Sequence, residues 1–251
     1  SYGAVMAMFL PPAIALLSKR NRPILTKVML AIATGVIALG LVFSFTRAAW
    51  VSLVVIAAIY AAMRFGFKLK TLLGVGVIML ALVWTSKDAI IIELQRNKQD
   101  SSDNLTEHVE SISNVSSDDS NLERLNRWSC AIALFQERPV TGWGPGTYQF
   151  VYAPFQKSDL KTIISTNNAD GGNAHSEYLG PLAEQGVLGA LFLILLMWWA
   201  SKIGFRLWGK IKNLDDRNLA VSVYLGLMSY FIHGVLNNYL DTDKANAPFW
   251  G

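Results

Sequence analysis

The transition from a polar segment into an apolar one at residues 171–186 decides how this chain folds. It reads Gly-Gly-Asn-Ala-His-Ser-Glu-Tyr-Leu-Gly-Pro-Leu-Ala-Glu-Gln-Gly. An amide, an imidazole, a carboxylate and a phenol fall between Asn173 and Tyr178, and an apolar run suited to a membrane follows. Histidine has the side-chain pKa nearest neutral pH, so His175 can take or give a proton at the mouth of this run. We therefore expect a reactive site here.

The composition places the rest of the chain in a membrane. Of its 251 residues, 52% are apolar and 16% are charged, and the mean hydropathy is +0.33. In soluble domains roughly a quarter of the residues are charged, which is more than in this chain. The net charge is +4, but the basic residues cluster beside apolar runs, so we expect membrane lipids and no nucleic acid as partners. A single cysteine, Cys130, excludes an intrachain disulfide and a cysteine-based metal cage.

Several apolar runs predict membrane spans. A short run over residues 2–17, interrupted by Pro11-Pro12, is expected to continue a helix that begins before this sequence. Five longer runs are expected to cross the bilayer, at residues 24–45, 48–63, 69–85, 179–200 and 219–240. The sequence thus predicts an all-α, polytopic transmembrane helical bundle with a large outer loop that contains helices. Its parts are residues 1–86, 87–178 and 179–251.

The outer loop changes character along its length. Residues 87–121 are rich in Ser, Asn and Asp and predict an irregular segment. Apolar residues then recur at three- and four-residue steps, which predicts an amphipathic helix that ends before Pro139; they are Leu122, Leu125, Trp128 and Ile132. Glycines at 142, 144 and 146 follow with no preceding strand and no following Lys, so we expect a turn and not a phosphate-binding loop.

The basic residues predict the orientation. The three short loops at residues 18–27, 64–70 and 201–217 carry twelve of them, whereas the short segments on the opposite side carry only Arg47 and Lys244. The segment from Lys202 to Arg217 is expected to be either a basic loop or an interfacial helix. Since cytoplasmic loops are the basic ones, Arg47, the large loop and the C-terminal tail are expected to face outside. His175 then lies on the outer face.

Several residues have both a structural and a functional interpretation. Arg47 is either a snorkelling interfacial residue or an anion clamp. Arg124 and Arg127 can share a helix face with Trp128 and bind a diphosphate, or lie on a solvated, ion-paired face. His233 is expected to make a buried hydrogen-bonded contact with Asn237, and His108 to have no role. The acidic pair in residues 241–243 is expected to order the tail and not to hold a metal.

Four groups of residues occur in a recognisable order. Thr46-Arg47-Ala48-Ala49-Trp50 opens a span. Arg124-Leu125 and Trp128 precede Arg138-Pro139-Val140-Thr141-Gly142-Trp143-Gly144-Pro145-Gly146-Thr147-Tyr148. His175-Ser176-Glu177-Tyr178-Leu179 leads to Glu184-Gln185-Gly186-Val187-Leu188-Gly189, and the ending runs from Asn237 to Lys244. Together they resemble the O-antigen ligase and polysaccharide polymerase superfamily of bacterial inner-membrane proteins.

The resemblance implies a GT-C-type glycosyltransferase without a cofactor. Such an enzyme takes a glycan from an undecaprenyl-diphosphate carrier on the periplasmic side. Ligases join it to lipid A–core, polymerases to another repeat unit, and related oligosaccharyltransferases to a protein Ser or Thr. Members of the superfamily have more spans than this chain supplies, so we expect an N-terminal half to be absent.

The expected roles follow from the chemistry of the transfer. A hydroxyl is a poor nucleophile at neutral pH, so we expect His175 to act as its base, oriented by Asn173 or Glu177. Arg47, Arg124 and Arg127 would stabilise the charge on the leaving diphosphate, which makes a metal dispensable. Asn173, Glu177, Tyr178 and Arg127 form the predicted substrate-binding set.

Two other classes of protein stay open. A transporter or flippase for a lipid-linked anion would also place arginine at the membrane boundary. It would need no large outer loop with an Arg/Trp helix, and it predicts ionisable groups nearer the middle of the membrane. Within the spans we find mainly Lys27, Glu184 and His233, which favours the transferase. An assembly subunit with a decayed site is the third possibility.

Overall fold

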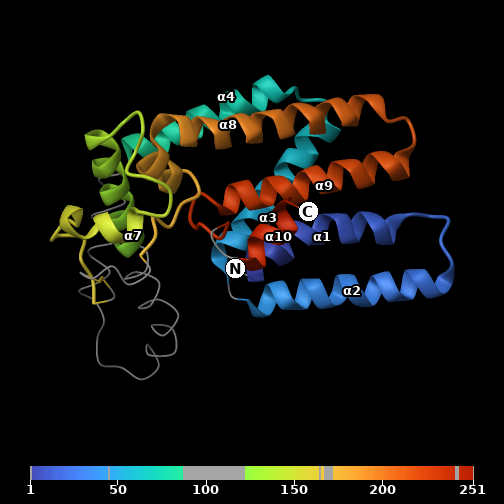
Figure 1. Ribbon diagram of the computed structural model, residues 1–251. Coiled ribbons are helices and arrows are strands. Elements are labelled where there is room, and N and C mark those ends of the chain that lie inside the picture. The colour runs from blue at the N-terminus through green and yellow to red at the C-terminus, as the bar shows by residue number, and fades with distance from the viewer. Residues whose placement is uncertain are drawn as a thin grey trace. The chain divides into compact units, whose positions relative to one another are not determined.

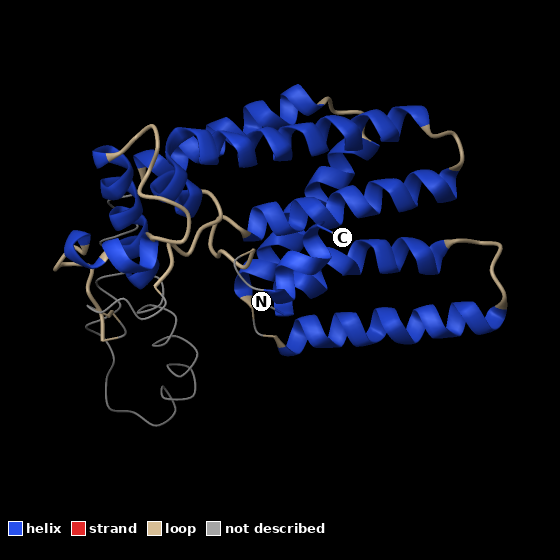
Figure 2. Ribbon diagram, viewed as in Figure 1, coloured by secondary structure: helices blue, strands red, loops and turns tan. Residues whose placement is uncertain are grey.

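The computed structural model describes residues 2–44, 46–86, 122–163, 165–166, 172–240 and 243–250. Across these ranges the chain forms helices and no strand (Figure 2). The helices in chain order are α1 (Tyr2–Ser18), α2 (Ile24–Phe43), α3 (Arg47–Arg64), α4 (Leu69–Thr85), a helix over residues 122–137, α7 (Tyr148–Val151), the 3₁₀ helix η1 (Ala153–Phe155), α8 (Leu179–Lys210), α9 (Leu214–His233) and α10 (Asp243–Trp250) (Figure 1). The predicted all-α class is confirmed, whereas the segment at 87–121 lies outside the described residues.

The helices α2, α3 and α8 are long and apolar enough to cross a membrane. They correspond to the runs predicted at residues 24–45, 48–63 and 179–200. In the described part of the chain, α1 and the first part of α4 are apolar but shorter. The predicted interruption at Pro11-Pro12 is wrong in detail, because α1 continues through both prolines.

Two predicted spans have different bounds in the structure. The helix α8 runs on to Lys210, so the helical alternative holds for most of the basic segment after residue 200. The helix α9 ends at His233 instead of 240 and is not among those apolar enough to span. Its first turn carries Asp215 and Asp216, and much of its length is buried by neighbouring helices, so it does not need a uniformly apolar surface.

The chain divides into two compact units, Ser1–Leu73 with Phe192–Gly251, and Gly74–Leu191. In the first unit, α9 packs against α1 and α3, and α1 also contacts α2 and α10. A small residue permits a close approach of α9 to α1, since a Cβ atom on Gly226 of α9 would lie 2.2 Å from the carbonyl oxygen of Met8.

The basic loops of the first unit open at the same end of its helices. Lys19 Nζ lies 3.4 Å from Asp216 Oδ1, which joins the end of α1 to the start of α9. Trp208, near the end of α8, meets Tyr60 edge to face at 5.9 Å and lies beneath the Arg217 guanidinium at 4.6 Å. The ends of α1, α3 and α8 therefore lie together with the start of α9.

The second unit has its own core beneath the helix over residues 122–137. Buried side chains from this helix, from α7 and the residue after it, from the segment before α8 and from the start of α8 form it; they are Cys130, Ala131, Leu134, Tyr148, Tyr152, Ala174 and Ala183. The predicted amphipathic helix is confirmed and ends before Pro139, as proline at that position favours. This core holds the segments on which the candidate site is built.

Candidate functional site

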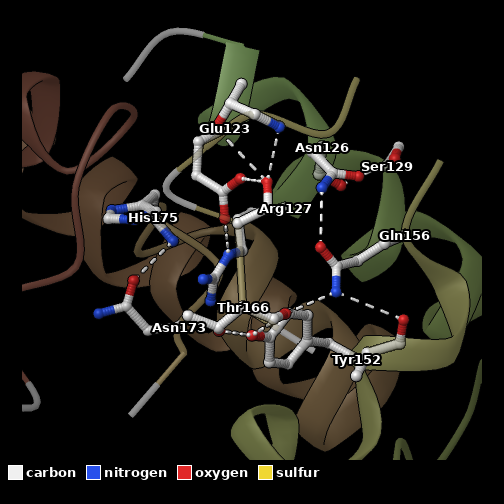
Figure 3. A network of polar contacts seen from close by, with 12 residues as sticks. Glu123, Asn126, Arg127, Ser129, Tyr152, Gln156, Thr166, Asn173 and His175 are labelled. Carbon is white, nitrogen blue, oxygen red and sulfur yellow. Dashed lines mark hydrogen bonds and ion pairs between the residues drawn. The ribbon is translucent and has the colours of Figure 1, made fainter. Parts of the chain in front are cut away.

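The backbone of His175 is held in an uncommon conformation. Its φ of 49° lies in the left-handed region, which is disfavoured for residues other than glycine. The His175 N–H donates to Asn173 Oδ1 at 3.1 Å (Figure 3). Trp128 Nε1 donates to the His175 carbonyl at 3.4 Å. Asn173, predicted to orient the imidazole, thus contacts the main chain of His175.

The surroundings of the His175 imidazole favour its neutral form. Burial, followed by the positive charges of Arg124 and Arg127, lowers the pKa of His175 from an ordinary 6.5 to about 4. Glu123 opposes this effect because a nearby negative charge favours the imidazolium. At neutral pH the ring is therefore uncharged and has a lone pair available to accept a proton.

Arg127 forms a buried ion pair with Glu123, which lies one helical turn before it. Its Nε lies 2.6 Å from Glu123 Oε1, and the two residues are 6% and 4% exposed. Ser165 Oγ donates to the other oxygen of Glu123, and the Arg127 guanidinium lies 4.4 Å above the Tyr152 ring. The predicted alternative of an ion-paired face is right about the pairing, but the face is buried and not solvated.

One donor of Arg127 remains available. Its Nη1 is buried, and within the described residues it has no hydrogen-bond partner. A Cβ atom on Gly172 would lie 2.2 Å from this nitrogen and 2.6 Å from the Tyr152 ring, so glycine lets the segment before His175 pass close to both. A guanidinium with a free N–H in a buried setting is suited to bind an anionic oxygen.

A second polar network, next to Arg127 in the chain, joins Asn126 to the segments around Gln156 and Thr166. Asn126 is fully buried, donates from Nδ2 to Gln156 Oε1 at 3.1 Å, and accepts from the Lys157 N–H at 3.0 Å. Gln156 Nε2 donates to the Thr166 carbonyl at 2.7 Å, and the Tyr152 hydroxyl also contacts Thr166 (Figure 3). Asn126 and Gln156 escaped the sequence analysis because each is satisfied by a partner distant in the chain.

The predicted apolar stripe of the helix over residues 122–137 is partly wrong. Leu122 is buried, but Ile132 is 40% exposed. The buried face carries Asn126, Arg127 and Cys130 instead. The hydrogen bonds of these polar residues make their burial possible, which apolar periodicity alone does not predict.

The glycine-rich turn is fastened to the beginning of α8 by Glu184. Its carboxylate accepts from the N–H groups of Gly146 and Tyr148, each at 2.9 Å, and its carbonyl accepts from Gly144 N–H at 2.7 Å. Gly142 has a φ of +66°, and a Cβ atom there would lie 2.3 Å from the Glu184 carbonyl carbon. These contacts agree with the prediction of a structural turn and identify Glu184 as its anchor.

Tyr148 connects this turn to Arg127. Its hydroxyl donates to the Arg127 carbonyl at 2.8 Å, and its ring stacks on Tyr152 at 5.3 Å between centroids. Burial raises the pKa of Tyr148, so the phenol stays protonated and remains a donor. Tyr148 therefore links Glu184, which anchors the turn, to the main chain of Arg127.

The other predicted site residues lie in two places. Glu177 is buried beside Tyr178, and burial, followed by the charge of Glu177, raises the pKa of the Tyr178 phenol. Arg124 belongs to the second unit and acts electrostatically on His175. Arg47 belongs to the first unit, where it is the exposed first residue of α3.

The remaining candidates are structural or lie outside the described residues. His233 is buried at the end of α9, with Nε2 3.3 Å from Asn237 Nδ2, as expected of a buried polar contact. His108 and residues 241–242 lie outside the described ranges, and Asp243 begins α10. Among the described residues no three His, Cys, Asp or Glu side chains gather as a metal site requires; metal independence stays a prediction.

These features define a helical membrane protein with a neutral histidine and buried arginine charge just before a spanning helix. A family model described as O-antigen ligase matches residues 30–194, and the chain belongs to this family. The activity of the family is glycan transfer of the ligase or polymerase type. The match contains Arg47, Arg124, Arg127 and His175. No curated protein matches the chain.

Proposed function

We propose that this protein transfers a glycan from an undecaprenyl-diphosphate carrier to an acceptor hydroxyl at the periplasmic face of the bacterial inner membrane. Lipid A–core is the proposed acceptor. The observation that carries this function is the neutral imidazole of His175 within the electrostatic influence of Arg124 and Arg127. A base and an anion site are the two groups that the reaction needs.

In the proposed reaction the acceptor oxygen attacks the anomeric carbon of the donor sugar. The hydroxyl proton passes to His175 as the new carbon–oxygen bond forms. The bond to the diphosphate breaks, and the leaving oxygen keeps the electron pair. Arg124 and Arg127 stabilise the resulting negative charge, which is the role a metal ion has in other transferases.

Donor binding would strengthen the base. A diphosphate beside Arg124 and Arg127 offsets their positive charges, which lower the pKa of His175 in the free protein. The imidazole would then be a stronger base in the donor complex than before it. Because this change depends on the anion, the base is activated where the leaving group is present.

The orientation is supported by the basic loops of the first unit. Three of them open at one end of its helices, and the contacts of Lys19, Tyr60 and Arg217 hold that end together. Such loops are cytoplasmic under the positive-inside rule. The helix α8 ends at Lys210 beside these loops, and its uninterrupted part over residues 187–210 rises about 36 Å, enough for one crossing.

Genetic complementation tests the function and identifies the acceptor. A strain that lacks the gene would receive the wild-type gene, His175→Ala, or the control His108→Ala, with equal membrane abundance verified. Lipopolysaccharide, long-chain polymer and glycoprotein would be profiled side by side. We expect one profile to lose its glycan in the deletion strain and to be restored by wild type and His108→Ala only. Full restoration by His175→Ala would contradict the proposal, and normal profiles in the deletion strain would favour a transport or assembly role.

A further inference from the structure

The turn that ends the helix over residues 122–137 is fixed against the beginning of the spanning part of α8. The Val187 N–H donates to the Pro139 carbonyl at 2.9 Å. Gly186 interrupts the helix with φ 67° and ψ −159°, and a Cβ atom there would lie 2.4 Å from the Val140 carbonyl oxygen. The backbone of the turn therefore lies at the level where the uninterrupted part of α8 begins.

The side chains at this level match the chemistry of a membrane boundary. Val140 is 62% exposed, and Leu188 and Leu191 on α8 are 66% and 45% exposed. An exposed valine alone needs no explanation. Here, however, it adjoins the exposed apolar surface of a helix long and apolar enough to span.

Arg138 and Trp143, which lie close to Val140 in the chain, form a pair of a kind found at the membrane–water interface. The exposed Arg138 guanidinium lies 4.1 Å from the Trp143 ring, and Trp143 Nε1 donates to the Leu134 carbonyl at 3.0 Å. Tryptophan is enriched at headgroup level, and arginine extends its charge toward the phosphates from an apolar base. Apolar, aromatic and cationic groups are thus held within six residues at one end of a span.

The geometry points to a membrane-docking turn, in which residues 138–140 lie in the headgroup layer of the bilayer at the His175 end of α8. Val140 contacts the acyl boundary and Arg138 contacts lipid phosphates. The docking turn continues directly from the helix that carries Arg124 and Arg127. Docking would fix the height of these arginines relative to the lipid phosphates, where the diphosphate of a lipid-linked donor also lies. Only this consequence rests on the proposed function.

Site-directed spin labelling measures the depth of the docking turn directly. The one cysteine of the sequence, Cys130, is fully buried and burial raises its pKa to about 11, so it need not be replaced. A nitroxide would be attached to Val140→Cys, to the exposed Glu137→Cys as the aqueous reference, and to Leu188→Cys as the spanning reference. The labelled chain would be placed in phosphatidylethanolamine and phosphatidylglycerol liposomes. Collision with oxygen, which partitions into lipid, would be compared with collision with a water-soluble nickel chelate.

We expect the oxygen-to-nickel ratio at Val140 to resemble that at Leu188 and to exceed that at Glu137 severalfold. A ratio at Val140 equal to that at Glu137 would overturn the inference. If Val140→Cys lowers the yield of folded protein, Thr141→Cys reports on the same turn, and there an aqueous value equal to Glu137 would count against docking. The measurement uses no donor. A His175→Ala background should leave it unchanged, so its failure is distinguishable from failure of the proposed transfer.

Discussion

Arg127 Nε lies 2.6 Å from Oε1 of Glu123, and both side chains are buried in the second unit. The pair fixes the guanidinium through one nitrogen and leaves Nη1 without a hydrogen-bond partner among the described residues. Glu123 therefore positions an arginine that keeps a donor for a ligand. The pair also makes the site sensitive to the loss of either charge, because a lone buried ion is strongly destabilising.

Removing the carboxylate should destabilise the second unit. We expect Glu123→Ala to lower the free energy of unfolding by about 3–5 kcal/mol, the usual cost of leaving a buried charge without its partner. Glu137→Ala on the exposed end of the same helix is the matched control and should have little effect. Thermal unfolding in detergent gives the comparison. Equal midpoints for the two variants would show that the buried pair does not stabilise the fold.

The pH dependence of transfer should reflect the lowered pKa of His175. Its neutral form persists from neutral pH to well below 6.5, so kcat/KM should decline only as the pH approaches about 4. In the same interval the unfolded chain binds a proton that the folded chain does not, so stability should fall as the pH decreases from 6.5 toward 4.

Arg124→Gln tests the cause of this shift. Loss of its positive charge should move the acidic limb of kcat/KM to higher pH, since Arg124 lowers the His175 pKa. In the wild type the limb of kcat should lie at higher pH than that of kcat/KM, because bound diphosphate offsets the arginines. The account would be contradicted if the acidic limb of kcat/KM lay near pH 6.5 in the wild type and did not move in Arg124→Gln.

Glu184 should control the order of the glycine-rich turn. Glu184→Gln replaces one acceptor oxygen by a donor, so the N–H groups of Gly146 and Tyr148 cannot both keep their partner. Hydrogen–deuterium exchange should become faster at these two amides. Glu137→Gln should leave them as slow as in the wild type. Unchanged exchange in Glu184→Gln would show that the main-chain contacts of the turn suffice.

Two glycines of this turn provide a matched comparison of space and strain. Both have positive φ, 66° at Gly142 and 74° at Gly146, which costs an alanine about 1–2 kcal/mol. A Cβ atom at Gly142 would also lie 2.3 Å from Glu184 backbone, whereas nothing lies within 4 Å of one at Gly146. Gly142→Ala should therefore lower the thermal midpoint clearly more than Gly146→Ala. Equal losses would mean that backbone strain alone is responsible.

The sequence predicts those parts of the structure that depend on local pattern. Apolar runs of sufficient length indicate α2, α3 and α8, and Pro139 marks the end of the preceding helix. The sequence analysis brings His175 together with Arg124 and Arg127 through the roles expected of them in the transfer, and these roles stay predictions. In the structure the charges of Arg124 and Arg127 act on the pKa of His175.

The remaining features depend on contacts between distant segments. Asn126 is buried because Gln156 and the Lys157 backbone satisfy it, and no periodicity reports such partners. Glu184 resembled an ionisable residue near a membrane boundary, but its charge is satisfied by the N–H groups of a turn that precedes it by more than thirty residues. The continuation of α8 to Lys210 was not predicted either, since the basic residues there indicated a loop or a separate interfacial helix.

The central claim is that His175 accepts the proton of the acceptor hydroxyl during transfer from a lipid-linked diphosphate. Its most direct test is single-turnover transfer by the full-length protein in liposomes, with labelled undecaprenyl-diphosphate glycan and lipid A–core, for the wild type, His175→Ala and His108→Ala. Donor binding would be measured separately. We predict that His175→Ala binds the donor but transfers no glycan, while His108→Ala transfers at the wild-type rate. Transfer by His175→Ala at that rate would contradict the account.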